Sequence, residues 1–274
     1  MAIFSTADRK NMMDYIIAFT ERNEHIMALI AVGSGAFGYN DELSDLDMVV
    51  AIDSDENMEA VMAYVAAQLN KRLNFIYFKQ MPQRKLQVYL GENFLEIDIG
   101  YGAYAGAAAT RKHWKVLFDK TGTIDEAMRV SWEAHEKRPK TDEQDKKLAE
   151  CADTAWHHLM HAAVAAKRGR YWRAVAELDL ARNFFIGLLG CRYSLDTGRG
   201  RDVDKLPEAE LNILNNTLVA ALTQDALWRS LSALADAIYT ELERYGERAC
   251  ITVNRRQVNE YINACRGLQG AAFG

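Results

Sequence analysis

The sequence has few cysteines, no long apolar run and no excess of basic residues, and each absence excludes a class of protein. Its four cysteines lie far apart and form no CxxC pair, so neither a zinc ribbon nor a disulfide scaffold is indicated. The longest apolar run, around residues 184–191, is too short to span a membrane, and the N-terminus lacks a signal-peptide layout. With 33 basic and 38 acidic residues the net charge is −5, which disfavours sequence-independent binding to nucleic acid. We therefore expect a cytoplasmic protein with neither membrane nor nucleic acid among its partners.

The composition present is that of a globular protein with more than one domain. The 274 residues are 49% hydrophobic and 26% charged, which supplies an ordinary core and argues against disorder. A typical length of about 150 residues per domain favours two domains. A charged stretch around Pro139 suits a joint between them. The predicted domains are 1–125 and 126–274.

The first half mixes apolar patterns of helical and strand period, whereas the second half has helical period alone. Strands are expected at 25–32, 46–52, 75–78, 86–90 and 94–99, and helices at 7–21 and 57–69. Further helices are expected at 148–167, 171–189, 208–222 and 226–245, with a break near Gly169. The predicted fold class is therefore α+β, an N-terminal sheet with helices followed by a C-terminal helical bundle.

One glycine-rich segment, AVGSGAFGYNDELSDLDMVVAID, fits two interpretations. Gly33, Gly35 and Gly38 match the dinucleotide-binding pattern G-x-G-x-x-G after a strand. Asp53 follows about 20 residues later, where that pattern has an acidic residue. The pattern also requires a helix after the last glycine, because the pyrophosphate binds at the helix N-terminus. Only residues 39–44, which are mostly turn formers, precede the next strand, so this interpretation is disfavoured.

The second interpretation is a phosphate-binding turn beside two carboxylates. The first strand leads into Gly33 and Ser34, where backbone N–H groups and a hydroxyl can face phosphate oxygens. The next strand begins with the sequence SDLD, and strand alternation places Asp45 and Asp47 on one face. Two carboxylates beside a phosphate site suit Mg²⁺, which binds a few protein oxygens together with substrate phosphates.

A second acidic pair comes from the strand expected at 94–99. Glu96 and Asp98 alternate there with apolar residues, so both carboxylates face the same side. An acidic outer face on a single half-buried strand is common and requires no function. Two such strands, one of which begins beyond a Gly-Ser turn, favour a metal site instead.

The spacing G-S-x(9)-S-D-x-D, from Gly33 to Asp47, resembles the signature of the DNA polymerase β-like nucleotidyltransferases. The chain also resembles the antibiotic nucleotidyltransferases, above all the lincosamide type, which join such a domain to a C-terminal helical domain. The similar stretches are LEIDIG, WKVLFDKTG, the Arg138-Pro139 turn and AAKRGRYWRA. Asp47 departs from the pattern, because close lincosamide enzymes carry glutamate there. This difference bears on the substrate rather than on the reaction.

The resemblance implies a mixed-sheet nucleotidyltransferase domain that transfers a nucleoside monophosphate, AMP in the first instance, from an NTP to a hydroxyl. Asp45 and Asp47 would hold two magnesium ions. Either Glu96 or Asp98 would accept the proton of the hydroxyl, and the resemblance favours Glu96, with Asp98 as a metal ligand. The residues expected to contact phosphates are Gly33, Ser34 and Ser44 in the first domain, and Lys167 and Arg168 in the helical domain.

The acceptor and the partners are less constrained by the sequence. The acidic balance suits a small cationic acceptor such as a lincosamide or an aminoglycoside, which would make the protein an antibiotic-resistance enzyme. The helical domain would serve in acceptor binding or in a homodimer. Two other functions stay open: a protein-modifying nucleotidyltransferase and a non-catalytic nucleotide-binding module. His157 and His161, four residues apart on one expected helix, favour packing or surface roles over metal binding.

Overall fold

The chain folds into two units, with the boundary after residue 138. The computed structural model describes residues 3–39, 41–72, 74–109, 111–137 and 140–267. The first unit is Met1–Arg138 and the second is Pro139–Gly274. The sequence placed the boundary at residue 125, inside the helix α3 (Ile124–Glu136). This helix belongs to the first unit, because Ile124 and Met128 are buried in a core of that unit.

A six-stranded mixed sheet forms the centre of the first unit. Its strands are β1 (Ile26–Ala31), β2 (Leu46–Ile52), β3 (Phe75–Met81), β4 (Leu86–Gly91), β5 (Glu96–Ala103) and β6 (Lys115–Asp119). They run in the order β3-β4-β5-β2-β1-β6, with β2 and β5 parallel and the other neighbours antiparallel. The α+β class and the mixed sheet predicted for this part of the chain are confirmed.

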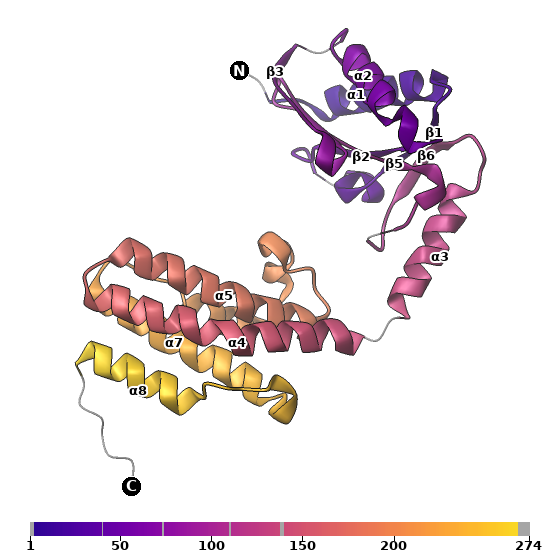
Figure 1. The fold of residues 1–274 in the computed structure, drawn as a ribbon. Helices are drawn as coiled ribbons and strands as arrows, with labels where there is room; N and C mark the ends of the chain where they lie inside the picture. The colour runs from indigo at the N-terminus through magenta and orange to yellow at the C-terminus, as the bar shows by residue number, and fades with distance from the viewer. Residues whose placement is uncertain (1–2, 40, 73, 110, 138–139, 268–274) are drawn as a thin grey trace. The chain divides into compact units, whose positions relative to one another are not determined.

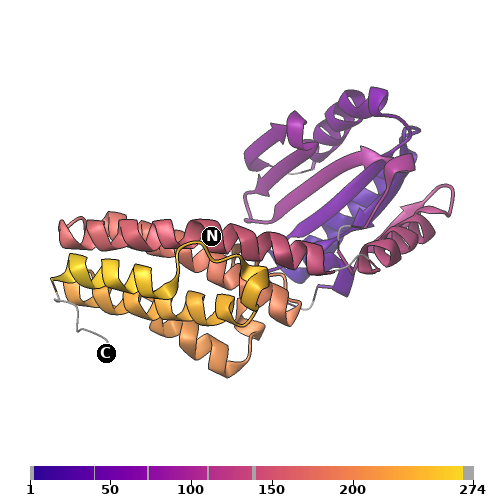
Figure 2. The ribbon, with the colours of Figure 1, turned by 60° about the horizontal axis from the view of Figure 1, so that its bottom comes forward.

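Helices cover both faces of this sheet (Figure 1 and Figure 2). On one face α1 (Thr6–Arg22) and α2 (Met58–Leu69) pack against large apolar strand residues such as Leu46 and Met48. On the other face α3 packs against smaller residues such as Ala28 and Ala51. Because successive residues of a strand point to opposite faces, β2 contributes side chains to both cores.

Helix α1 begins with a capping box and buries one face. Ser5 accepts a hydrogen bond from the N–H of Asp8, and the Asp8 carboxylate accepts one from the N–H of Ser5 at 2.9 Å. Met12 and Ile16 lie on the buried face, as helical spacing predicts. Arg9 lies on the same face and is only 4% exposed. A buried arginine needs polar partners, and those of Arg9 lie near the candidate site.

The second unit is a helical bundle, as the sequence predicts. Its helices are α4 (Lys140–Lys167), α5 (Tyr171–Tyr193), α6 (Glu208–Asn216), α7 (Gln224–Glu243) and α8 (Arg255–Arg266). The four longer helices lie side by side in both ribbon views (Figure 1 and Figure 2). Helix α4 buries many alanines, and small side chains let neighbouring helices approach closely.

The charged stretch that suggested a joint is helical from Lys140 onward. Asp142 and Glu143 lie in the first turn of α4, where carboxylates interact favourably with the helix dipole. The predicted break between helices is confirmed at Gly169, which has φ +69° and lies between α4 and α5. Among the described residues, no helix combines the length and the apolar character that crossing a membrane requires.

Candidate functional site

Four strand ends meet at one end of the sheet in the first unit. Ala31, the last residue of β1, lies beside Met48 of β2 and beside Lys115, the first residue of β6. The parallel register places Leu46, the first residue of β2, beside Ile97 near the start of β5. We call this the carboxylate end, because Asp45, Asp47, Glu96 and Asp98 all lie here.

The glycine turn after β1 lies directly against one of these acids. Gly33 begins a 3₁₀ helix, η1 (Gly33–Phe37), and has φ +59°, a conformation that glycine adopts without strain. A Cβ atom on Gly33 would overlap with Oδ2 of Asp47. The backbone N–H of Val32 also donates to the carbonyl of Asp47 at 3.0 Å. Only a glycine therefore lets this turn pack so closely on the Asp47 carboxylate.

Ser34, the second residue of the turn, holds a buried hydroxyl that has no hydrogen-bond partner among the described atoms. A buried hydroxyl without a partner costs free energy, and native structures rarely leave one unexplained. A ligand oxygen bound on the turn would supply the missing partner. Phosphate binding on this turn stays a prediction, and the buried hydroxyl of Ser34 is compatible with it.

The arrangement rules out the dinucleotide interpretation. β1 and β2 are antiparallel, whereas a dinucleotide-binding unit joins two parallel strands through an α-helix. The segment after Gly33 is a short 3₁₀ helix instead. Asp53 lies just beyond the opposite end of β2, where it accepts a hydrogen bond from Asn57 at 2.9 Å and pairs with His25 at 2.9 Å.

The four acids form two levels on one face of the sheet. Asp47 of β2 and Asp98 of β5 are directly opposite each other in the parallel register. Two residues earlier on each segment, the same register places Asp45 level with Glu96. Asp45, Asp47 and Asp98 are half-buried and Glu96 is exposed, while the residues between them point into the core. The alternation predicted for both strands is confirmed.

We call Asp47 and Asp98 the inner level and Asp45 and Glu96 the outer level. Burial and like charge disfavour ionisation of the two inner acids. Burial raises the pKa of Asp47 to about 6, with Asp45 and Glu96 adding to the rise and Arg111 opposing it. Burial likewise raises the pKa of Asp98 to about 6, and the neighbouring acids add to it. The Oδ1 atom of Asp98 is buried and has no hydrogen-bond partner among the described atoms. A bound cation would favour the ionised form of both carboxylates.

The carboxylates fit a divalent cation by their chemistry. Asp45, Asp47 and Asp98 present hard oxygens, which Mg²⁺ prefers, and a cation would satisfy the unpartnered Oδ1 of Asp98. Among the described residues, no three acidic, histidine or cysteine side chains already converge as a metal site. Mg²⁺ also binds through one or two carboxylates and completes its shell with phosphate and water.

Arg9 holds the loop that carries Asp45 into β2. Its guanidinium donates to the carbonyl of Ser44 at 2.9 Å and to that of Asp41 at 3.0 Å. It also lies over the ring of Tyr39, 4.5 Å from the centroid. The Ser44 hydroxyl, predicted to contact phosphate, donates to the Asp41 carboxylate at 2.7 Å. Sequence reasoning missed Arg9, although an arginine on the apolar face of a helix is a signal for such a role.

The segment before β6 adds basic and aromatic groups that sequence reasoning also missed. The charge of Arg111 lowers the pKa of Asp47, so its guanidinium acts on the carboxylate end. The ring of His113 lies 4.5 Å from the ring of Phe37, the last residue of η1. The pairing of β6 with β1 brings these residues beside the glycine turn. No spacing rule links residues so far apart in the sequence.

Two predicted phosphate contacts lie in the second unit. Lys167 is the last residue of α4 and Arg168 follows it directly. The first unit by itself brings together Gly33, Ser34 and the four acids, but does not contain these two basic residues.

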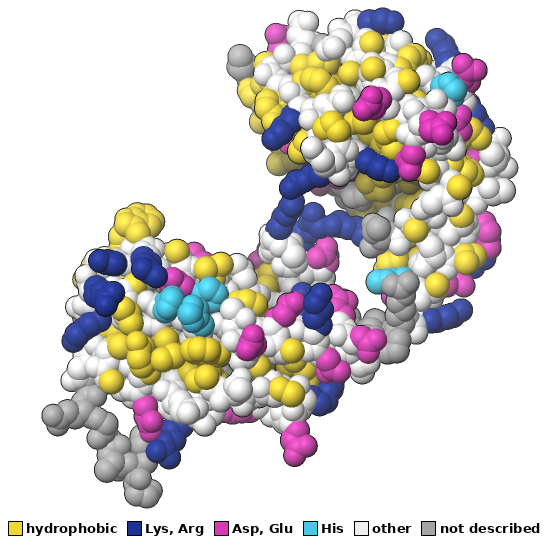
Figure 3. Space-filling model, in the orientation of Figure 1, with side chains coloured by type: hydrophobic (Ala, Val, Ile, Leu, Met, Phe, Trp, Pro, Cys, Tyr) yellow, Lys and Arg dark blue, Asp and Glu magenta, His cyan; other side chains and the backbone are white. Residues whose placement is uncertain are grey.

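Histidines in the second unit form a cluster between α4 and α5. His158 lies 2.9 Å from Glu177, and the rings of His157 and His161 lie 4.0 Å apart. Figure 3 shows histidine side chains, in cyan, gathered on the surface of the helical unit. The pairing of His158 with Glu177 gives this cluster a structural contact between two helices.

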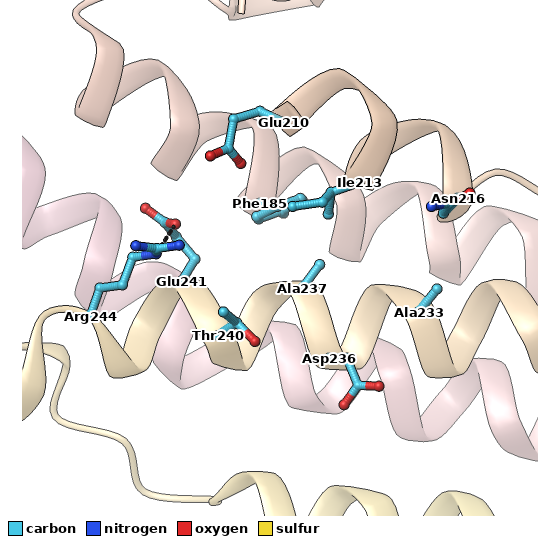
Figure 4. Close-up of a pocket in the computed structure, with 10 residues that line it drawn as sticks. All are labelled: Phe185, Glu210, Ile213, Asn216, Ala233, Asp236, Ala237, Thr240, Glu241 and Arg244. Carbon is cyan, nitrogen blue, oxygen red and sulfur yellow. Dashed lines mark ion pairs between the residues drawn. The ribbon is translucent and has the colours of Figure 1, made fainter. Parts of the chain in front are cut away.

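A cavity of about 260 Å³ lies among α5, α6 and α7 (Figure 4). Phe185 and Ala237 line it together with Glu210 and Glu241. Arg192 forms ion pairs with both glutamates, with Nη1 lying 2.8 Å from Oε2 of Glu241. Because its acids are already paired with arginine, this cavity is a weaker candidate for transfer chemistry than the carboxylate end.

No protein-family model matches this chain, and no curated protein matches it. Among solved structures, it is similar to an aminoglycoside 6-adenyltransferase from Bacillus subtilis, with 13% identity, a TM-score of 0.43, and coverage of 94% of this chain and 98% of that chain. It is also similar to a nucleotidyltransferase-like protein from Exiguobacterium sibiricum, with 8% identity, a TM-score of 0.43, and coverage of 95% and 89%.

Proposed function

We propose that this protein is a nucleotidyltransferase that transfers a nucleoside monophosphate from an NTP to a hydroxyl of a small molecule. The acceptor oxygen attacks the α-phosphorus and forms the new P–O bond. The bond from this phosphorus to the bridging oxygen breaks, and pyrophosphate leaves. The hydroxyl proton passes to a carboxylate of the protein. Transfer of AMP from ATP is the form that we test first.

The contact between the glycine turn and Asp47 is the observation that carries this proposal. The Gly33 backbone lies against the Asp47 carboxylate, and the neighbouring Ser34 hydroxyl is buried and unpartnered among the described atoms. A phosphate bound on the turn would therefore lie beside acids that suit a divalent cation. Phosphoryl transfer depends on this kind of positioning and charge neutralisation.

The two levels of acids suggest a division of roles. Asp45, Asp47 and Asp98 would hold magnesium, which when bound neutralises charge on the transferred phosphate. Glu96 is exposed and lies at the outer level, so its side chain can accept the proton of a hydroxyl held beyond the metal ligands. The proposed phosphate contacts are Gly33 and Ser34, with Ser44, Lys167 and Arg168 as further candidates.

The acceptor that we propose is a small cationic molecule with hydroxyl groups, such as an aminoglycoside or a lincosamide. The neighbouring acids add to the rise in the pKa of Asp47 and of Asp98, so negative charge is concentrated at the carboxylate end. Acidic clusters concentrate cations from solution, and the chain as a whole carries a net charge of −5. Both observations support a cationic acceptor over an anionic one.

The test is to incubate the protein with Mg²⁺, each NTP in turn and a panel of aminoglycosides and lincosamides. We expect pyrophosphate release that requires both Mg²⁺ and an acceptor, and a product heavier by one nucleoside monophosphate. Asp47→Asn is the matched control, because it keeps the side-chain size and removes the charge. A mass increase on a protein would favour the protein-modifying alternative, and NTP binding without any transfer would favour the non-catalytic one.

A further inference from the structure

An aromatic pair lies at the surface beside the glycine turn. Phe37 is 56% exposed, and its ring centroid lies 4.5 Å from that of His113, with an angle of 54° between the planes. Within the described residues, Phe37 packs into none of the three hydrophobic cores. His113 is also exposed. Packing of the core therefore does not explain the pair.

The pair lies close to the place where phosphate would bind. Side chains three residues apart eclipse one another in a 3₁₀ helix, so Ser34 and Phe37 lie on the same side of η1. At about 2.0 Å of rise per residue, the two positions are separated by about 6 Å along the helix axis. A ribose spans a comparable length between a phosphate and its base.

The other member of the pair is also connected to the carboxylate end. Arg111, two residues before His113, acts electrostatically on Asp47. Two residues after His113, Lys115 pairs with Ala31 at the end of β1. The segment from Arg111 to Lys115 thus connects the acids with the end of β1. His113 lies in the middle of this segment, where its ring contacts that of Phe37.

We propose that Phe37 and His113 form the platform on which the base of the NTP stacks. This inference rests on the proposed function, because it assigns a contact to the same nucleotide. Every base has a π face, so stacking contributes affinity with little preference among bases. A base lying on Phe37 would remove an exposed apolar ring from water while its triphosphate binds the glycine turn and the metal ions.

The test compares two ligands that share phosphates and differ in the base. Calorimetry measures the binding of ATP and of inorganic tripolyphosphate, each with Mg²⁺, to the wild-type protein and to Phe37→Ala. Stacking energies predict a Kd for ATP that is roughly 5-fold to 100-fold higher in Phe37→Ala. The Kd for tripolyphosphate should not change. Phe37→Trp should keep the affinity for ATP. His113→Ala should raise the Kd for ATP by a smaller factor than Phe37→Ala does, and should leave the Kd for tripolyphosphate unchanged.

Tyr77→Ala is the matched control, because Tyr77 is an exposed aromatic residue, 47% accessible, on β3 at the far edge of the same sheet. It should leave both Kd values unchanged. The platform is overturned if Phe37→Ala changes neither Kd, because the base then does not contact Phe37. It is also overturned if both Kd values rise equally, because that indicates a general change in the turn. If the wild-type protein binds neither ligand, the proposed function fails as well.

Discussion

The two units of this protein treat buried charge in opposite ways. In the first unit, Asp47 and Asp98 lie opposite each other with further acids nearby, and burial with repulsion raises both pKa values to about 6. In the second unit, Glu241 is 3% exposed, and Arg192 opposes the rise in pKa that burial causes. A buried charge that is paired with its opposite recovers part of its desolvation cost, whereas like charges held together cost stability unless a ligand binds. The difference supports the proposal that the carboxylate end of the first unit carries the chemistry.

The largest effect is expected when the two acids of β5, Glu96 and Asp98, are substituted one at a time. Glu96→Gln should lower kcat by about 10²–10⁴-fold with little change in the KM for nucleotide, because it removes the proposed base. Asp98→Asn should lower kcat less and should raise the Mg²⁺ concentration that activity requires. Steady-state rates and Mg²⁺ titrations of both variants make the test. If Asp98→Asn is inactive and Glu96→Gln is nearly normal, the two roles are reversed.

The corresponding change in the second unit should affect folding instead. Arg192→Met leaves Glu210 and Glu241 without their shared cation, and breaking a buried pair costs about 3 kcal/mol of unfolding free energy. Arg129→Met is the control, since Arg129 is 52% exposed and pairs on the surface of α3. Its cost should stay below about 1 kcal/mol. Urea unfolding measures both, and an equal loss for the two variants would contradict the comparison.

Arg9 tests whether the loop before β2 needs to be held for activity. Arg9→Met removes the hydrogen bonds to the carbonyls of Asp41 and Ser44, and we expect a loss of about 10-fold to 100-fold in kcat. The Mg²⁺ requirement should rise as well, because Asp45 follows this loop directly. Lys10→Met, on an exposed neighbour in α1, is the control. A lower Tm with unchanged kcat and Mg²⁺ requirement would show that Arg9 has a purely structural role.

Two aspartates of the first unit should give pH dependences of opposite sign. In the metal-free protein, Asp47 has a folded-state pKa of about 6, above the ordinary value of 3.8, so its ionised form costs stability at higher pH. Asp47→Asn should therefore raise Tm at pH 7 to 8, and this gain should shrink as the pH falls through about 6 toward 4.

Asp119 provides the contrast. Its pKa is lowered, because hydrogen bonds, including one from the N–H of Ile124 at 2.8 Å, outweigh the effect of burial. The ionised form is thus favoured in the folded state above the ordinary pKa, and this stability is lost as the pH falls through the folded value. Asp119→Asn should lower Tm at pH 7 and have less effect in acid. Thermal melts across this pH range would contradict the account if both variants shifted in the same direction.

The face on which the four acids lie could be predicted, because strand alternation depends only on neighbouring residues in the sequence. The apolar run from Leu46 to Ile52 is the strand β2, and alternation along it places Asp45 and Asp47 on the opposite face from the core. The same reasoning holds for Glu96 and Asp98 on β5. Their roles in metal binding and proton transfer stay predictions, which the variants above test.

The contacts that shape the site could not be predicted in this way. Arg9 reaches Ser44 across 35 residues, and Phe37 meets His113 only because β6 pairs with β1. Such contacts depend on tertiary packing, which no periodicity in the sequence records. Three elements were missed for a related reason. β6 is short and half-buried, while α3 and α8 each bury only two residues.

The most direct test of the central claim is the thermal stability of the wild-type protein and of Asp47→Asn with and without Mg²⁺ and ATP. A ligand at about 100 times its Kd stabilises the folded state by about 2.7 kcal/mol. We predict that ATP with Mg²⁺ raises the Tm of the wild-type protein, that Asp47→Asn loses most of this shift, and that NAD has no effect on either. An equal shift in both proteins, or stabilisation by NAD alone, would contradict the assignment of the carboxylate end as a magnesium–nucleotide site.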